Sequence, residues 1–407
     1  MITSGGGMAS ESVDIAIVGG GLVGASLGCA LAPLIRRAGL RVAVIEAAPL
    51  GESRTADYQP SFDARASAIA QGSRRHFAAL GLWPALAREA TAIGTIHVSE
   101  RGRLGAVRLT AAEMGVEALG YVLPNAWLGR VLHERLGELP LRWHCPATVE
   151  SLTPRDGGHR LTLSDGHTLD AGLTVLADGG RSGLKERLGI DSDATPYEQS
   201  ALIATLEVSR PHRGIAYERF TPDGPLALLP MPGRRMELVW THEQGAEQTT
   251  LALSDGDFLA RLQRAFGERA GRFTRVGRRH VYPLSLVTAR EPVRPGLAVL
   301  GNAAHALHPV AGQGFNLALR GVMDLVAALE HGLADGLAPG EMAVMQDFEA
   351  RRAADRHNVI RFSDGLIRLF GIDHPLLSHA RAAGLVGLNL VGPLRRTLAR
   401  RAMGVER

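Results

Sequence analysis

Residues 13–46 read VDIAIVGGGLVGASLGCALAPLIRRAGLRVAVIE, and this stretch decides the fold class. The apolar run at 13–18 predicts a buried strand, and the composition of 22–38 predicts a helix. A second apolar run at 41–45 predicts another strand, which ends on Glu46. The order strand, helix, strand indicates a βαβ unit, so we expect an α/β protein with a Rossmann-like domain.

The turn between the first strand and the helix carries G-x-G-x-x-G at Gly19, Gly21 and Gly24. The first glycine suits a tight turn, the second lets the backbone approach a pyrophosphate, and the third lets helix and strand pack closely. The helix N-terminus favours the anion. Glu46 follows Gly24 by 22 residues, near the distance at which a carboxylate meets a nucleotide ribose. These features favour dinucleotide binding over a purely structural glycine turn.

The same stretch also has the length of a membrane span. Residues 15–35 are 21 positions without a charge, and glycines recur within them every four residues. Consecutive glycines at 19–21 disfavour a helix interior, however, and suit a turn. The acidic Glu11 and Asp14 stand where a signal peptide carries basic residues. We therefore expect neither a membrane span nor a signal peptide here.

Further along, local patterns predict helices and hairpins. Helical spacing of apolar residues predicts a helix over 63–80, which Asp63 would cap, and another over 125–136. Asp-Gly pairs at 156–157 and 165–166 predict hairpin turns between short strands.

The later segments suggest how the chain divides. Strand-like runs over 201–240 lack intervening helices, which indicates an inserted antiparallel sheet. A buried strand is expected at 296–300, and the chain beyond Gly314 reads as mostly helical. The expected division is a flexible N-terminus (1–12), a discontinuous nucleotide-binding domain (13–85, 123–190 and 280–345), a substrate domain (86–122 and 191–279) and a helical C-terminal region with a basic tail (346–407).

Two further motifs follow predicted strands. DGGRS at 178–182 taken alone reads as an ordinary turn. LAVLGNAAHALHPVAGQGFNLALRGV at 297–322 is more specific, because a strand ends at Gly301-Asn302 and a loop rich in glycine and proline then feeds a helix near Phe315. Glycines there let the backbone approach a flat ring, and the helix N-terminus presents N–H donors to negative charge.

The chain resembles the flavin-dependent aromatic hydroxylases of the para-hydroxybenzoate hydroxylase type over nearly its whole length. Three signatures carry the resemblance: G-x-G-x-x-G near the start, A-D-G-x-x-S in the middle and G-[DN]-A-A-H…P-x-x-G-x-G-x-N late. DARASAIA (63–70), GNAAHALHPVAGQGFNLALR (301–320) and RRAMG (400–404) look most like the ubiquinone-biosynthesis hydroxylases, and among them the 2-octaprenyl-6-methoxyphenol branch. The resemblance implies a Rossmann-like FAD-binding domain with an inserted antiparallel β-sheet substrate domain and a helical C-terminus.

The resemblance also implies where FAD binds. The glycines of the first motif would lie at the pyrophosphate with Arg65 nearby, and Glu46 would lie on the adenosine ribose. The second motif would serve FAD and NAD(P)H, and the third would meet the ribityl chain and the isoalloxazine ring. The residues expected to bind FAD are Gly19, Gly21, Gly24, Glu46, Arg65, Asp178, Gly179, Gly301, Asn302, Pro309, Gly312, Gly314 and Asn316.

Several positions are less well defined by the resemblance. Most relatives have aspartate where Asn302 stands; asparagine keeps an acceptor oxygen but removes a charge, so we expect FAD to bind less tightly. The catalytic residues stay unassigned: His305 and His308 are candidates, although a histidine in such a loop is more often a hydrogen-bonded loop residue than a base. Arg130 is a candidate in a segment that matches relatives poorly. No metal site is expected.

The implied activity is that of an FAD-dependent monooxygenase. It would hydroxylate the aromatic ring of a polyprenylated phenol in ubiquinone biosynthesis with O₂, through a flavin C4a-hydroperoxide. No second G-x-G-x-x-G occurs in the sequence, so NAD(P)H is expected as a transient electron donor. Apolar strands within 201–239, including 226–229 and Met231, could wall the substrate pocket, although for each of these residues taken singly a place in the sheet core is the more common outcome.

Other functions stay open at this point. The enzyme could hydroxylate another ring position or another aromatic substrate, or act as a flavin reductase or as a dehydrogenase on isoprenoid chains. In a different class, the chain could be a non-catalytic, FAD-bearing assembly factor of a quinone-synthesis complex.

Composition and charge limit the partners. The 407 residues are 45% hydrophobic and predict two to three globular domains. Cys29 and Cys145 lie far apart, which excludes a disulfide scaffold and a zinc ribbon and suits a reducing compartment, the cytoplasm. The net charge of +4 is local, because residues 376–407 carry six arginines and one glutamate. We therefore expect no nucleic-acid partner.

The tail offers two interpretations. Residues 382–394 are uncharged and largely apolar, and four clustered arginines follow them. This pattern fits contact of 381–407 with the inner face of the cytoplasmic membrane or with a quinone-synthesis complex. The alternative is a C-terminal helix packed on the domain with a solvated basic face.

Overall fold

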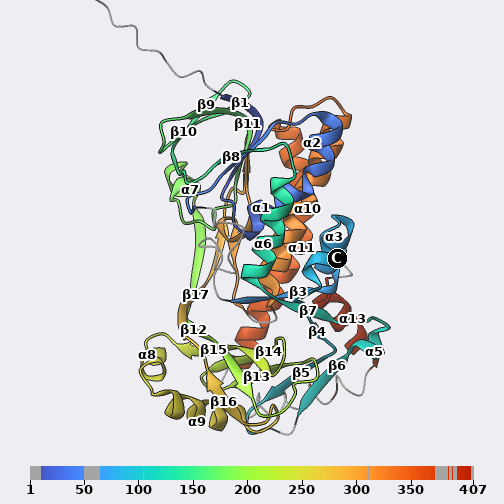
Figure 1. The fold of residues 1–407 in the computed structure, drawn as a ribbon, viewed down its shortest axis with the longest axis vertical. Coiled ribbons are helices and arrows are strands. Elements are labelled where there is room, and N and C mark those ends of the chain that lie inside the picture. The colour runs from blue at the N-terminus through green and yellow to red at the C-terminus, as the bar shows by residue number, and fades with distance from the viewer. Residues whose placement is uncertain are drawn as a thin grey trace, which may run out of the picture.

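The computed structural model describes residues 11–49, 65–103, 105–309, 312–371 and 392–404, with Gly384 and Gly387. Figure 1 shows a largely parallel sheet with a layer of helices beside it, and a second sheet at the other end of the molecule. The long strands β12 (Ser192–Val208) and β17 (His280–Ala289) run from one region to the other.

The first sheet has eight strands, in the order β18-β19-β11-β1-β2-β8 with β10 and β9 continuing from β11. The members are β1 (Glu11–Val18), β2 (Val42–Ile45), β8 (Arg142–His144), β9 (Val149–Arg155), β10 (Gly158–Leu163), β11 (Thr168–Leu176), β18 (Val293–Arg294) and β19 (Leu297–Val299). Strand β1 runs parallel to both neighbours, with Val18 opposite Ile45 and Leu176. The carboxyl ends of these parallel strands therefore meet at one edge, as the predicted βαβ unit requires. Both Asp-Gly hairpin turns also form as expected, between β9 and β10 and between β10 and β11.

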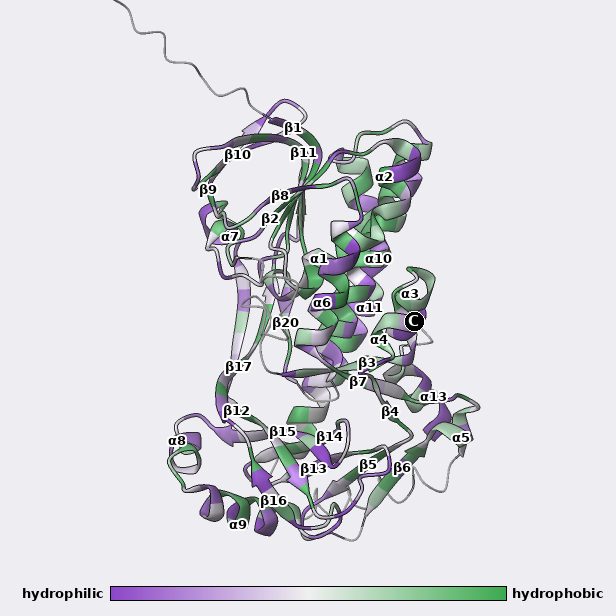
Figure 2. Cartoon of the chain, viewed as in Figure 1, coloured by the Kyte–Doolittle hydropathy of each residue, from purple (hydrophilic) through white to green (hydrophobic). Residues whose placement is uncertain are grey.

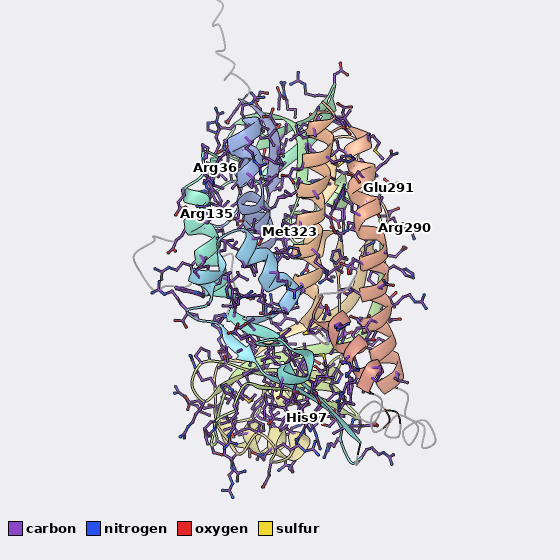
Figure 3. The ribbon with its side chains drawn as sticks, turned by 90° about the vertical axis from the view of Figure 1, so that its right-hand side faces the viewer. Arg36, His97, Arg135, Arg290, Glu291 and Met323 are labelled. Atoms are coloured by element: carbon purple, nitrogen blue, oxygen red, sulfur yellow. The ribbon has the colours of Figure 1, made fainter. Side chains whose placement is uncertain are left out.

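The helix expected over 22–38 is two helices, α1 (Leu22–Ala30) and α2 (Ala32–Ala38). Leu31 separates them, and a proline stands in the first turn of α2, where it is tolerated. Helix α1 packs beside α6 (Asn125–Gly137) and α10 (Gln313–Ala334). Figure 3 shows this helical layer face on, with Met323 of α10 near its middle. The apolar colouring in Figure 2 follows these packed helices and the central strands.

The single helix expected over 63–80 is wrong. Residues 66–70 form strand β3 (Ala66–Ala70), and only 71–79 form a helix, α3 (Gln71–Ala79); Asp63 lies outside the described residues. Strand β3 pairs with β7 (Gly120–Pro124), which also pairs with β4 (Thr91–Ile93). Pairing with a distant strand overrides the local helical spacing. A short helix, α4 (Trp83–Leu86), follows α3.

The second sheet has nine strands, in the order β20-β17-β12-β15-β14-β13-β5-β6 with β16 on β12. Besides β12 and β17 they are β5 (Thr95–Glu100), β6 (Ala106–Thr110), β13 (Ile215–Thr221), β14 (Gly224–Pro230), β15 (Arg235–Glu243), β16 (Phe273–Val276) and β20 (His305–Ala306). Apart from the parallel pair β13 and β5, the pairings are antiparallel. Strand β17 begins at the expected domain boundary yet belongs to this sheet. The division into two domains stays a prediction. Residues 280–289 pair with β12, so they belong with the substrate domain's sheet rather than with the nucleotide-binding domain.

Shorter helices and the C-terminal helices complete the fold. The shorter ones are α5 (Ala111–Met114), α7 (Leu184–Arg187), α8 (Ala246–Leu251), α9 (Asp255–Phe266) and the 3-10 turn η1 (Gly301–Ala303). After α10 the chain forms α11 (Met342–Gly371), which packs along α10, and α13 (Gly392–Ala402), which packs on α5. Within the part of the chain that the structure describes, no helix is both long and apolar enough to cross a bilayer.

Candidate active site

A cavity of about 740 Å³ lies where the two sheets and the helical layer meet. Its walls come from the carboxyl ends of β1, β2 and β11, from β3, from the N-terminus of α10 and from the inner face of the nine-stranded sheet. The residues expected to bind FAD that line it are Gly19, Gly21, Glu46, Arg65, Asp178, Gly179, Asn302, Pro309, Gly312, Gly314 and Asn316. Folding thus brings three motifs that are far apart in sequence to one cavity.

The first glycine motif has the geometry of an anion cradle. Gly19 has φ +104°, and a Cβ there would lie 2.7 Å from the carbonyl oxygen of Ala177. A Cβ on Gly24 would lie 1.8 Å from the carbonyl oxygen of Gly19, so Gly24 closes the turn from behind rather than lining the cavity. A Cβ on Gly21, by contrast, would meet no described atom within 4 Å. Gly21 therefore borders open space at the start of α1, where a pyrophosphate could approach.

Glu46 joins the glycine turn to the end of β2. Its carboxylate is 7% exposed; Oε2 accepts a hydrogen bond from the Gly20 N–H at 2.6 Å, and Oε1 accepts one from the Ala48 N–H at 2.8 Å. A carboxylate has about four lone-pair positions, so these two bonds leave capacity for ribose hydroxyls. Its position suits the expected ribose contact.

The second motif forms a closed loop at the same cavity. Asp178 accepts hydrogen bonds from the backbone N–H groups of Gly180 and Ser182, each at 3.0 Å. These bonds hold the loop in shape, with Gly179 at φ +71°. Arg65 also lines the cavity, and its guanidinium carbon lies 4.5 Å from the ring centroid of Tyr282, a partner that sequence reasoning missed.

The third motif places the N-terminus of α10 at the cavity wall. Gly312 has φ +59°, and a Cβ there would lie 2.9 Å from Cβ of Ala68. A Cβ on Gly314 would meet no described atom within 4 Å, so the cavity wall is open beside this residue. Asn302 is exposed and lines the cavity, whereas Gly301 lies behind it, against Val23. This arrangement offers backbone N–H groups and an uncovered surface to a flat ring.

The histidine candidates do not reach the cavity wall. His305 is 2% exposed, and burial together with Arg352, whose Nη2 lies 3.2 Å from Nδ1, holds its pKa well below the usual range. Burial lowers the pKa of His308 to about 4, and its ring meets Tyr197 edge on. Both are therefore neutral near pH 7. Arg130 lies on α6 in an ion pair with Glu134 at 2.9 Å and is also absent from the described cavity wall.

The cavity has an apolar end, to which the nine-stranded sheet contributes only some of the lining residues. Ala227 and Leu229 line it, whereas Leu226 and Leu228 face the core on the other side of the sheet, because side chains alternate along a strand. Leu226, Leu228 and Met231 are thus core residues, the alternative that was the more common outcome for each of them, and Met231 packs with Ile93 and Ala216. Further apolar lining comes from Ile93, Ile96, Leu109, Leu119, Ala399 and Met403.

Comparison with known proteins settles the family. A model of the FAD binding domain family matches residues 12–363. The chain belongs to this family. The flavoprotein is 40% identical to "Ubiquinone hydroxylase UbiL" of Rhodospirillum rubrum, over 98% of this chain and 91% of that protein. It is 31% identical to 3-demethoxyubiquinol 3-hydroxylase of Escherichia coli, over 98% of this chain and 100% of that protein.

A solved structure supports the fold. PqsL, described as a probable FAD-dependent monooxygenase from Pseudomonas aeruginosa, superposes with a TM-score of 0.76 at 24% identity, over 93% of this chain and 100% of that one. The glycine cradle and the Glu46 carboxylate fit FAD by their own chemistry. The predictions of an FAD cofactor and of an FAD-dependent aromatic-ring monooxygenase are confirmed by the family match and by the relatives from R. rubrum and E. coli.

Proposed function

We propose that this flavoprotein hydroxylates the ring of a polyprenylated phenol in ubiquinone biosynthesis. One observation carries the substrate class: the cavity joins an end lined by glycine loops to an end walled by apolar side chains. A cofactor with phosphates suits the first end, and an isoprenoid chain suits the second. The names of the relatives from R. rubrum and E. coli support the same pathway.

Each part of the cavity has a chemical task in this reaction. The turn at Gly21 binds the pyrophosphate and the Glu46 carboxylate accepts ribose hydroxyls, while Asp178 and Gly179 lie where both FAD and a visiting NAD(P)H would contact the chain. Bound FAD supplies the redox chemistry that passes electrons from NAD(P)H to O₂. The apolar strands exclude water from the ring. Overall, O₂, NAD(P)H, one proton and the phenol yield the hydroxylated phenol, NAD(P)⁺ and water.

Isotope labelling tests the reaction. The purified holoenzyme, given NADH or NADPH and 2-geranylphenol under ¹⁸O₂, should form a product that carries one ¹⁸O atom. The fragmentation pattern of that product gives the ring position. Label that enters from H₂¹⁸O instead, or turnover without oxygen in the product, would reject the monooxygenase and favour a reductase or dehydrogenase.

The prenyl chain occupies the apolar end in this proposal, against α13. Ala399 is 1% exposed and lines the cavity. An Ala399→Phe substitution should shorten that end and lower kcat/KM for an octaprenylphenol about tenfold, while a dimethylallylphenol is affected less than twofold, because only the long chain reaches the new ring. Thr397→Phe, on the exposed side of the same helix, is the control. Equal loss with both substrates would place the chain elsewhere.

The tail also has a proposed surface role. Ala399 and Met403 pack α13 against Leu109 and Leu119, and Arg395 pairs with Glu113 at 2.8 Å, as the packed-helix interpretation expects. Arg396 and Arg400 remain exposed, and we propose that they hold the protein at an anionic membrane surface on the cytoplasmic side. An Arg396→Gln/Arg400→Gln variant should sediment severalfold less with phosphatidylglycerol vesicles at low salt. Unchanged sedimentation would exclude this contact.

A further inference from the structure

A group of arginines lies on the face of the nine-stranded sheet that is turned away from the cavity. Ile96 of β5 and Leu109 of β6 are paired and line the cavity. His97 and Arg108 are the next pair along these strands, so their side chains lie on the opposite face, because side chains alternate along a strand. Figure 3 shows His97 in the lower part of the molecule, away from the helical layer. This face is therefore separate from the expected FAD site.

Two guanidinium groups come together over the side chains of His97 and Ser99 on β5. Arg269, in the loop after α9, places Nη1 3.4 Å from Nε2 of His97. Arg219 of β13 pairs in register with Ser99 and donates a hydrogen bond from Nη1 to the Ser99 Oγ at 3.4 Å. His97 and Ser99 are both buried, and two residues on one strand are separated by roughly 7 Å. The two guanidinium groups thus occupy neighbouring positions above buried polar side chains.

These cations lack a countercharge among the described residues. Arg219, Arg269 and Arg101, which follows β5, form no ion pair with a carboxylate in the part of the chain that the structure describes. The Nε of Arg219 is shielded from solvent and has no hydrogen-bond partner among those residues. Strand alternation directs the side chains of Glu100 and Glu218 to the other face of the sheet. The charge on this face is therefore left for a partner from outside the chain.

The positive charges also act on one another. Burial, together with the charges of Arg269 and Arg101, lowers the pKa of the Arg219 guanidinium. Burial and the neighbouring arginines, chiefly Arg269, lower the pKa of His97 to about 4, so this ring is neutral near pH 7. A neutral ring can accept a hydrogen bond from Arg269 at Nε2 but cannot balance its charge. Holding several cations this close costs free energy, which a bound anion offsets.

We propose that the arginine cluster formed by Arg101, Arg108, Arg219 and Arg269 binds a phosphate group. A guanidinium can donate two parallel hydrogen bonds to two phosphate oxygens, and here two guanidinium groups reach neighbouring positions. A phosphate monoester carries between about one and a half and two negative charges near pH 7, which balances two arginines better than a carboxylate does. The group can belong to a soluble molecule or to a lipid head group, since the recognising chemistry is the same.

The test uses the holoenzyme, in which FAD fills the pyrophosphate site, and inorganic phosphate as the probe. Isothermal titration calorimetry at constant ionic strength should give a Kd of about 1 mM or lower for the wild type. Arg219→Gln/Arg269→Gln should bind at least tenfold more weakly, because both converging donors are removed. Arg234→Gln/Arg278→Gln removes the same charge from exposed positions beside the same sheet and should bind as the wild type does.

Vesicles distinguish the two sources of the phosphate. If the group belongs to a lipid, Arg219→Gln/Arg269→Gln should sediment severalfold less with phosphatidylglycerol vesicles at low salt than the control Arg234→Gln/Arg278→Gln. Weaker binding of inorganic phosphate with unchanged sedimentation would indicate a soluble ligand instead. If the cluster variant matched its control in both measurements, the phosphate site would be overturned.

A single substitution guards against an unstable double variant. Arg269 is exposed, so Arg269→Gln should unfold at the wild-type temperature in the absence of phosphate and bind phosphate about threefold more weakly. Phosphate should raise the unfolding temperature of the wild type more than that of this variant, because only a ligand of the native state stabilises the fold. Equal stabilisation of both proteins would count against the site. None of these measurements uses turnover, so their outcome is independent of the proposed reaction.

Discussion

A Gly21→Val variant should fold normally and bind FAD at least a hundredfold more weakly than the wild-type chain. The backbone of Gly21 is extended, with φ −66° and ψ −171°, which valine adopts without strain. A Cβ there meets no described atom within 4 Å, so the added carbons enter the cavity rather than the protein. They would occupy the space next to the N–H groups at the start of α1. A hundredfold loss corresponds to about 2.8 kcal/mol of binding free energy.

Fluorescence titration of the apoprotein with FAD measures this loss, and circular dichroism and thermal unfolding report the fold. Gly256→Val in the first turn of α9 is a matched control, because a Cβ there also meets no described atom within 4 Å. The control should retain wild-type affinity. Tight FAD binding by Gly21→Val would mean that the pyrophosphate lies elsewhere.

The same variant separates the enzyme from the assembly factor. An enzyme without FAD makes no product, so cells that carry only Gly21→Val should accumulate the unhydroxylated prenylphenol. A scaffold needs only the fold, which this substitution preserves, and would maintain quinone levels. Normal quinone content with a colourless variant protein would therefore favour the scaffold.

An Asn316→Leu variant should lose roughly 3–5 kcal/mol of unfolding free energy. Asn316 is 1% exposed, and its amide joins three backbone groups: it accepts from the Ala70 N–H at 2.8 Å and donates to the carbonyls of Ala68 at 2.8 Å and Gly312 at 2.7 Å. Leucine has a similar size but no polar atoms, so all three groups lose this partner. Each unsatisfied buried group costs about 1–3 kcal/mol.

Urea denaturation of the apoprotein measures this change without a contribution from FAD binding. Asn316→Asp should be comparably unstable, because its second oxygen would face two carbonyl acceptors. Asn358→Leu on the exposed side of α11 is the control and should change stability by less than about 0.5 kcal/mol. A stable Asn316→Leu would show that β3 holds its position without this amide.

Asn316 was expected to bind the cofactor, but in the structure its side chain binds protein backbone groups. The resemblance placed it beside the isoalloxazine ring, and it does line the cavity. Its side chain, however, donates both N–H groups to protein carbonyls. It therefore shapes the flavin loop by fastening α10 to β3, a strand that sequence periodicity had presented as a helix.

The sequence by itself determined the βαβ unit, the glycine turn within it, the position of Glu46 at the end of the second strand and the local form of each of the three motifs. These features depend on residues close together in the chain, where glycine conformations and apolar periodicity act directly. The strand at 235–240, RMELVW, carries a single acid among apolar residues, and no local pattern indicates which face of the sheet this acid occupies. Only strand register shows that this acid faces the cavity rather than solvent.

The tertiary structure alone decided the rest. It buried the side chains of His305 and His308 away from the cavity wall. It also paired β3 with β7 and brought Ala399 of α13 to the apolar end of the cavity. Each outcome depends on contacts between residues tens to hundreds of positions apart. No local pattern records such contacts, because the free energy that selects them arises when distant apolar surfaces pack and distant backbone groups pair.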